Sequence, residues 1–176
     1  MERKDEAFAV WITGLPASGK STIAAALRAQ LADRGVDIAV LESDVLRKVF
    51  GGDRPYSAEG RDAFYRQMIF VGSLLVEHGV PVIFDATANR RVYRERARRE
   101  IDQFLEVYLD VPLATCIARD PKGIYRGAAS GEATNGPGLQ DSYEPPEVPD
   151  VIVDGENPGA DARQIIEKLA AKGYIK

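Results

Sequence analysis

Hydrophobic runs of strand length alternate along the chain with segments in which hydrophobic residues recur every three or four positions. The first pattern predicts buried strands and the second predicts amphipathic helices. Strands are expected at 7–13, 37–43, 80–86, 104–111 and 150–155. Helices are expected at 20–35, 57–79, 90–101, 113–120 and 161–173, with a short helical piece after Asp44.

Strands and helices that alternate in this way are typical of βαβ units, which build a parallel sheet with helices on both faces. We therefore predict an α/β fold of three layers around a five-stranded parallel sheet. The chain has 176 residues, 45% of them hydrophobic, which suits one well-buried domain, so 1–176 is taken as a single domain. The pattern fails between about 120 and 149, which we interpret as a lid; a disordered insertion is the alternative.

Charge and composition narrow the function classes. A formal net charge of −4 argues against a nucleic acid as the main partner. The single cysteine, Cys116, excludes an internal disulfide framework and favours the cytoplasm; we expect it to be a small buried residue on a helix. No hydrophobic run reaches the roughly 18 residues of a membrane span, and the N-terminal stretch does not resemble a signal peptide, so no membrane association is expected.

The stretch "WITGLPASGKST" contains the pattern G-x-x-x-x-G-K-S between a predicted strand and a predicted helix, the context that a phosphate-binding P-loop requires. Backbone N–H groups and the positive end of the helix would bind phosphates, while Gly14 and Gly19 let the main chain approach closely. Lys20 would place its charge near the β- and γ-phosphates, and the Ser21 hydroxyl would bind Mg²⁺. The predicted ATP site comprises Gly14, Leu15, Pro16, Ala17, Ser18, Gly19, Lys20, Ser21 and Thr22.

Carboxylates come at the ends of two predicted strands. Glu42 and Asp44 lie two positions apart, on one face of an extended chain at the sheet edge where ligands bind. We interpret Asp44 as the base that accepts a hydroxyl proton, with helix capping as its alternative role. Asp85 ends the third strand and is either a residue near the metal or a capping residue. The predicted metal ligands are Ser21, Glu42, Asp44 and Asp85.

Basic residues follow Asp44 along the chain. Arg47, Arg61 and Arg66 are the leading candidates to bind an anionic substrate, although a single arginine is more often solvated. The run Arg90–Arg99 is interpreted as a solvated helix face. His78, the sole histidine, is expected only to contact the end of its helix. Because the chain has no Asn-Lys-x-Asp sequence for guanine and carries arginines beside a lid, it is read as a phosphotransferase.

With these residues in place, the chain resembles the adenylylsulfate kinases, P-loop kinases that phosphorylate the ribose 3′-hydroxyl of adenosine 5′-phosphosulfate (APS). The likeness covers nearly the whole chain and is most specific in "ARDPKGIYRGAASGE" and "DSYEPPEVPDVIVD". It implies ATP and Mg²⁺ as cofactors, a nucleotide as substrate and a homodimer. It also implies Asp44 as the base, Arg47 and Arg61 as substrate contacts, and Tyr56 as a stacking partner of the adenine. Lys122 would close over the second nucleotide, and Arg119 would lie near ATP.

Departures from the family pattern gather around the acceptor. Val45 and Phe64 stand where the family has asparagine, Glu42 stands where it has aspartate, and "ATAN" (Ala86–Asn89) replaces its Phe-Ile-Ser-Pro segment. Phe64 is therefore included among the substrate-binding positions. Three functions stay open: an APS kinase, a kinase of the same scaffold with another nucleotide-linked or small hydroxyl acceptor, and a nucleotide-binding protein without catalysis.

Overall fold

The computed structural model describes residues 7–51, 53, 56–129 and 142–176. Its elements, in chain order, are β1 (Ala9–Thr13), α1 (Lys20–Ala32), β2 (Ala39–Glu42), α2 (Ser43–Phe50), α3 (Ala58–Glu77), β3 (Val82–Asp85), α4 (Arg91–Glu100), β4 (Phe104–Leu109), α5 (Leu113–Arg119), α6 (Ile124–Ala129), β5 (Val151–Val153) and α7 (Pro158–Ala171).

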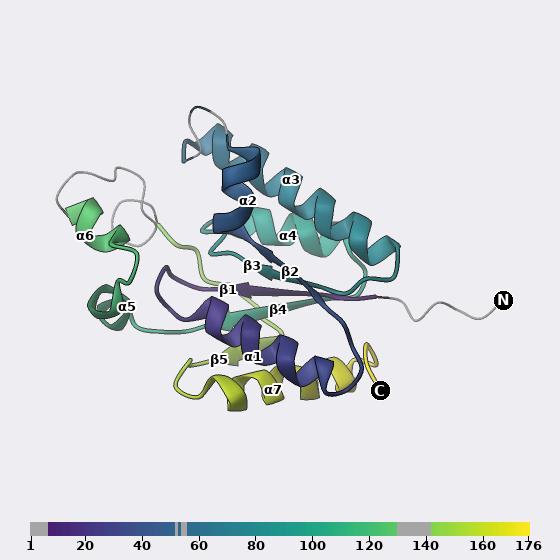
Figure 1. Ribbon diagram of the computed structural model, residues 1–176. Coiled ribbons are helices and arrows are strands. Elements are labelled where there is room, and N and C mark those ends of the chain that lie inside the picture. Colours follow the sequence, from purple (N-terminus) through teal and green to yellow (C-terminus); the bar gives the residue numbers. More distant parts are fainter. Residues whose placement is uncertain (1–6, 52, 54–55, 130–141) are drawn as a thin grey trace.

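The five strands form one parallel sheet in the order β2-β3-β1-β4-β5. Helices α1 and α7 cover one face and α3 and α4 cover the other, which gives three layers (Figure 1). The predicted α/β architecture is confirmed. Strands β2 and β3 lie on one side of β1, and strands β4 and β5 lie on the other. The strand order therefore reverses at β1. The carboxyl end of β1 is a topological switch point, where sheets of this kind bind ligands.

The core divides according to the alternation of side chains along β1. Phe8, Val10 and Ile12 pack toward α1 and α7, whereas Ala9 and Trp11 pack toward α3 and α4. Because both faces of the strand are covered, all five residues of β1 are buried. The sheet is therefore a rigid platform from whose carboxyl edge the functional loops emerge.

Helix ends follow local sequence signals. The Ser57 side chain accepts a hydrogen bond from the N–H of Gly60 and caps α3, which begins one residue after its predicted start. Asn157 caps α7 in the same way, and the helix begins at Pro158, three residues before its predicted start. His78 lies at the end of α3 beside the carbonyl oxygen of Leu74, as predicted.

The predicted lid, 120–149, is not irregular throughout. Residues 124–129 form α6, and residues 142–150 return without helix or strand and form hydrogen bonds with Arg91 and Arg94 of α4; residues 130–141 lie outside the described residues. Tyr125 on α6 is 2% exposed and belongs to the core on the α1 and α7 side of the sheet, so this stretch also contributes to the core. Among the described residues, no helix combines the length and the hydropathy needed to cross a membrane.

Candidate active site

The P-loop joins β1 to α1 and needs glycine at two positions for different reasons. A Cβ on Gly14 would lie 2.8 Å from the carbonyl oxygen of Leu109, closer than atoms can pack. Gly19 has φ of 103°, in the left-handed region that favours glycine, and α1 begins directly after it. The first glycine therefore allows β1 and β4 to approach, and the second turns the chain into the helix.

Lys20 lies at the first position of α1 and bends back across the loop. Its Nζ donates hydrogen bonds to the carbonyl oxygens of Gly14, at 3.2 Å, and Leu15, at 2.9 Å. Burial lowers the pKa of Lys20 to about 8, while the charges of Asp85 and Asp44 act in the opposite direction. The ammonium group is thus held over the loop in a place where a phosphate would favour its charged form.

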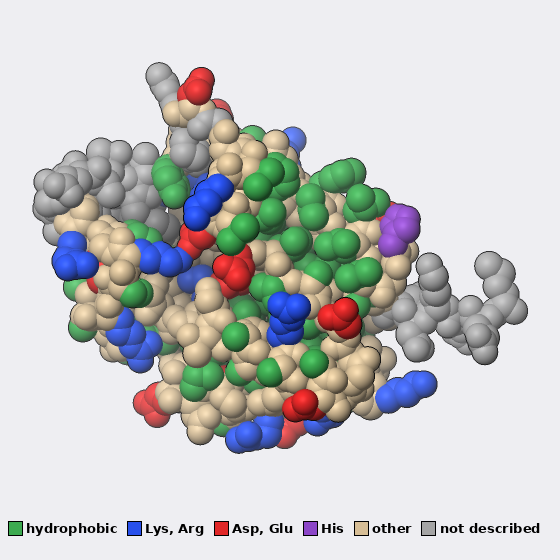
Figure 2. All heavy atoms as spheres, viewed as in Figure 1, with side chains coloured by type: hydrophobic (Ala, Val, Ile, Leu, Met, Phe, Trp, Pro, Cys, Tyr) green, Lys and Arg blue, Asp and Glu red, His purple; other side chains and the backbone are tan. Residues whose placement is uncertain are grey.

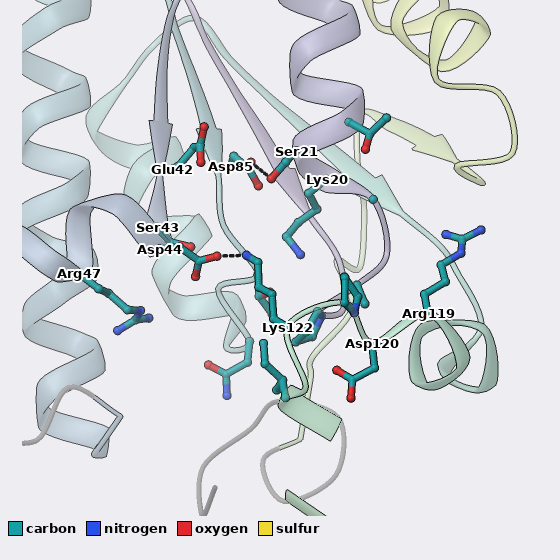
Figure 3. A pocket seen from close by; sticks show the side chains of 18 of the residues that line it. Lys20, Ser21, Glu42, Ser43, Asp44, Arg47, Asp85, Arg119, Asp120 and Lys122 are labelled. Carbon is teal, nitrogen blue, oxygen red and sulfur yellow. Dashed lines mark hydrogen bonds and ion pairs between the residues drawn. The ribbon is translucent and has the colours of Figure 1, made fainter. Parts of the chain in front are cut away.

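Ser21 and Asp85 meet across the carboxyl edge of the sheet. The Ser21 hydroxyl donates to Asp85 Oδ2 over 2.6 Å (Figure 3). Asp85 is the register partner of Ile12 in β1 and of Glu42 in β2, so the two carboxylates end adjacent strands at one level. Hydroxyl and carboxylate oxygens are the donors that Mg²⁺ prefers, so this pair fits a magnesium ion.

Asp44 lies in the first turn of α2, directly after β2. The N-cap of α2 is Glu42, so the alternative in which Asp44 serves only as the cap does not hold. Asp44 is half exposed and forms an ion pair with Lys122, which reaches it from the α5–α6 connection (Figure 3). Its hydrogen bond to Asp44 raises the pKa of Lys122. The predicted base and the predicted lid lysine are therefore in direct contact.

A cavity of about 840 Å³ opens where these groups converge. The predicted site residues that line it are Pro16, Ala17, Gly19, Lys20, Ser21, Thr22, Glu42, Asp44, Arg47, Tyr56, Arg61, Asp85, Arg119 and Lys122. Gly14, Leu15, Ser18 and Phe64 are not among the lining residues. Figure 2 shows acidic and basic side chains close together on this face, beside the hydrophobic side chains that lie over α3.

The arginines that follow Asp44 behave differently from one another. The guanidinium carbon of Arg47 lies 4.1 Å from the ring centre of Phe64 and 5.0 Å from that of Tyr56, distances of cation–π contacts. Phe64 is 5% exposed and lies behind Arg47, so its effect on a substrate would be indirect. Arg61 is buried and lines the cavity. Arg66 pairs with Asp62 on the surface of α3 and does not line the cavity, so the structure does not bring this candidate together with Arg47 and Arg61.

The connection through α5 and α6 is attached to the P-loop. Arg119 donates from Nη1 to the carbonyl oxygen of Ser18 at 3.5 Å, and the Tyr125 hydroxyl donates to that of Pro16 at 2.8 Å. Asp120 accepts hydrogen bonds from the backbone N–H groups of Tyr125 and Arg126 and so caps α6. Tyr125 and Asp120 were missed in the sequence because their roles depend on the fold of a stretch that showed no periodic pattern. Cys116 on α5 is buried, as predicted, and burial raises the pKa of its thiol.

One arginine of the basic helix α4 is buried, against the prediction of a solvated face. Arg94 is 1% exposed and donates from Nη1 to Thr13 Oγ1 at 3.1 Å and to the Tyr143 hydroxyl at 3.3 Å. Its Nη2 donates to the carbonyl oxygen of Glu144, and its Nε lies 3.6 Å from Glu106 Oε2. Arg94 therefore joins the last residue before the P-loop to the segment that returns from the lid. The signal in the sequence is an arginine directly beside Tyr93 and three positions before Ala97, both on the buried face of the helix.

The "ATAN" loop is held at each of its four residues. The carbonyl oxygen of Ala86 accepts from Trp11 Nε1 at 3.1 Å, and that of Thr87 accepts from Thr13 Oγ1 at 2.6 Å. The N–H of Ala88 donates to the Tyr65 hydroxyl, and the carbonyl oxygen of Asn89 accepts from the backbone N–H of Glu144. Thr87 and Asn89 line the cavity, so this loop forms a fixed wall of it.

The site combines a P-loop at the switch point of a five-stranded parallel sheet, a lysine and a serine at the end of that loop, and a carboxylate and two arginines that line the same cavity. These features define a P-loop phosphotransferase. A family model described as adenylylsulphate kinase matches residues 6–154. The chain is 40% identical to the adenylyl-sulfate kinase of Microcystis aeruginosa over 174 residues, 98% of this chain and 96% of the relative. It is 37% identical to that of Halothermothrix orenii over 175 residues, 98% of this chain and 95% of the relative. The chain belongs to the adenylylsulphate kinase family.

A solved structure of high similarity is that of the Mycobacterium tuberculosis APS kinase in complex with AMPPNP and APS. The TM-score is 0.88 at 33% sequence identity, and the match covers 94% of this chain and 98% of that one. A gluconokinase from Sinorhizobium meliloti, at 17% identity and a TM-score of 0.61, shares the fold alone, with 95% of this chain and 94% of that one covered.

Proposed function

We propose that the protein is an ATP-dependent kinase that phosphorylates the ribose 3′-hydroxyl of adenosine 5′-phosphosulfate. One observation carries the proposal: in a member of this family, the P-loop Lys20, the carboxylate of Asp44 and the guanidinium groups of Arg47 and Arg61 line the same cavity. One cavity lined by all four residues could hold the phosphate donor beside Lys20 and the acceptor beside Asp44. The solved relative that holds a nucleotide analogue together with APS supports the same assignment.

The P-loop would bind the phosphates of ATP through its backbone N–H groups and the positive end of α1. Lys20 would turn from the carbonyl oxygens of Gly14 and Leu15 to the β- and γ-phosphates and stabilise the charge of the transferred group. Ser21 and Asp85 would hold Mg²⁺, with Glu42 and Asp44 acting through ordered water. The ion would neutralise charge on the β- and γ-phosphates.

Asp44 would accept the proton of the ribose 3′-hydroxyl while the oxygen of that hydroxyl attacks the γ-phosphorus. At the same time, the bond from the γ-phosphorus to the β–γ bridging oxygen would break. Arg47 and Arg61 would bind the anionic end of the acceptor, and Tyr56, which is 48% exposed, would stack on its base. Lys122 would exchange its ion pair with Asp44 for contacts to the second nucleotide. Arg119 would stay beside ATP, on the far side of the P-loop.

The departures from the family pattern support one alternative, a kinase of the same scaffold with another acceptor. Phe64 contributes no amide to the cavity, and Val45 is exposed on α2. A site built around hydrogen bonds from side-chain amides discriminates strongly between acceptors. Because this chain lacks the two asparagines, its choice of acceptor can differ from that of the family. The third possibility, a protein without catalysis, is disfavoured by the convergence of Lys20, Ser21 and Asp44 on one cavity.

The test is acceptor-dependent ADP release from MgATP, measured with APS, with adenosine 5′-phosphate and with a panel of other nucleotides. Selective turnover with APS is expected. Turnover with another acceptor alone would assign the protein to the alternative kinase, and no acceptor-dependent release would assign it to the non-catalytic class. A homodimer, which the family resemblance implies, stays a prediction, and light scattering during size-exclusion chromatography tests it.

A further inference from the structure

The acceptor half of the cavity, the part lined by Arg47 and Arg61, contains a tyrosine to which the proposed reaction gives no role. Tyr65 lies on α3, is 3% exposed and is one of the lining residues. Its ring stacks on that of Tyr93 with 4.6 Å between centroids and lies 6.2 Å from that of Trp11. Because these neighbours belong to the core, the position of the Tyr65 hydroxyl is fixed before any ligand arrives.

The hydroxyl group already accepts hydrogen bonds from protein donors. The backbone N–H of Ala88 donates to it at 3.1 Å, and the guanidinium group of Arg47 also contacts it. Among the described residues, both of these partners are hydrogen-bond donors. The Tyr65 hydroxyl can therefore donate its own proton to another group. Burial raises the pKa of Tyr65, with Arg47 acting against that shift, so the phenol is neutral near pH 7 and keeps its proton.

The contact with Ala88 also decides what the "ATAN" loop presents to the cavity. Ala88 has φ of 44°, in the left-handed region, and its N–H is used by Tyr65. This amide is therefore not available to a ligand. The donor that remains at this point is the phenolic O–H of Tyr65, a residue that lines the cavity.

Arg47 supplies a positive charge beside this donor. Its guanidinium carbon lies 5.7 Å from the ring centre of Tyr65, with the rings of Phe64 and Tyr56 packed against it. Aromatic rings restrict the orientation of a guanidinium group without competing for its N–H donors. A fixed O–H donor next to a restrained guanidinium group is suited to an anionic oxygen.

We propose that Tyr65 is a binding residue of the acceptor site. The Tyr65 hydroxyl donates a hydrogen bond to an anionic oxygen of the acceptor, and Arg47 binds the same anionic group. The inference rests on the proposed function, because it assumes that the acceptor enters this half of the cavity. It adds a determinant that is contributed by α3 and oriented by Ala88. The selected feature is the anionic group of the acceptor, independently of its base.

The test is the dissociation constant of APS in the presence of ADP, measured by titration calorimetry on the native protein and on Tyr65→Phe. This change removes one hydroxyl and keeps the stacked ring. The matched control is Tyr93→Phe, which makes the same change on the neighbouring ring, a residue that does not line the cavity. Loss of a hydrogen bond to a charged group predicts at least about tenfold weaker binding for Tyr65→Phe. Tyr93→Phe should change the constant by less than about twofold.

Adenosine, which lacks the anionic group, serves as a second probe and should bind the native protein and Tyr65→Phe equally. Unchanged affinity of Tyr65→Phe for APS would overturn the inference, whether or not its melting temperature falls. Equal weakening for APS and adenosine would overturn it too, because the hydroxyl would then not act on the anion. If the native protein binds APS but does not phosphorylate it, the proposed function fails while the comparison of dissociation constants still decides the role of Tyr65. If the native protein does not bind APS, both fail.

Discussion

Replacing Arg94 by methionine tests whether the buried guanidinium group stabilises the fold around the P-loop. The substitution keeps a long side chain but removes the donors to Thr13, Tyr143 and Glu144 and the charge beside Glu106. Breaking a buried charge pair by removing one partner costs about 3–5 kcal/mol. Glu106 keeps a second cation, Arg98, with 3.8 Å between Nη2 and Oε1, so we expect a loss near the lower limit, about 3 kcal/mol.

The loss should depend on pH in a direction set by Glu106. Burial raises the pKa of Glu106, and the charges of Arg94 and Arg98 act against that shift. Without Arg94, the pKa of Glu106 in the folded state rises further above its pKa in the unfolded chain. Between these two pKa values, Glu106 is protonated more in the folded state than in the unfolded chain. Stability then falls as pH rises through that interval. The deficit of Arg94→Met should therefore be larger at pH 8 than at pH 5.

The assay is urea unfolding at 25 °C and both pH values, with the free energy of unfolding extrapolated to water. The matched control is Arg99→Met, an exposed position on the same helix, expected within about 0.5 kcal/mol of the native protein. The double variant with Glu106→Gln should recover part of the loss at pH 8. A deficit for Arg94→Met no larger than that of the control, or equal at pH 5 and pH 8, would refute the reasoning.

Three further predictions concern the reaction itself. Lys20→Ala should lower turnover by roughly 10²-fold or more with any acceptor, and near-native ADP release would contradict the P-loop assignment. Asp44→Asn should lower kcat far more than it weakens ATP binding, with Asp37→Asn as the exposed control; a collapse of ATP affinity would instead show that Asp44 mainly organises the metal. Because the pKa of Lys20 is lowered to about 8, MgATP affinity should be nearly constant below pH 8 and fall by up to about tenfold per pH unit above it. Affinity that stays constant from pH 7 to 9.5 in calorimetry would contradict that dependence.

The sheet and the donor half of the site could be predicted from the sequence because their signals are local. The P-loop is a contiguous stretch, and its neighbouring strand and helix are defined by periodicity alone. Asp85 and Glu42 were located by the rule that parallel strands end at a common edge, and the register of β2 and β3 places them together. These inferences need no knowledge of which distant residues meet.

The remainder depends on contacts between distant residues. From the sequence, Arg94 was predicted to be one cation on a solvated basic helix. It is buried instead, because its hydrogen-bond partners are Thr13, 81 positions away, and Tyr143, 49 positions away. Phe64 was placed in the acceptor site by alignment with a family position, whereas its ring lies behind Arg47. Tyr65 could not be recognised in advance, because its proposed role depends on a hydrogen bond from the backbone N–H of Ala88, 23 positions away in the sequence.

The measurement that tests the central claim most directly is identification of the product formed from MgATP and APS. Mass spectrometry and phosphorus–proton correlation spectroscopy would locate the new phosphate, with Asp44→Asn as the comparison. The expected result is one phosphate on the ribose 3′-oxygen, formed by the native protein and nearly absent with the variant. APS recovered unchanged, while ATP is consumed with a different acceptor or not at all, would contradict the proposed reaction.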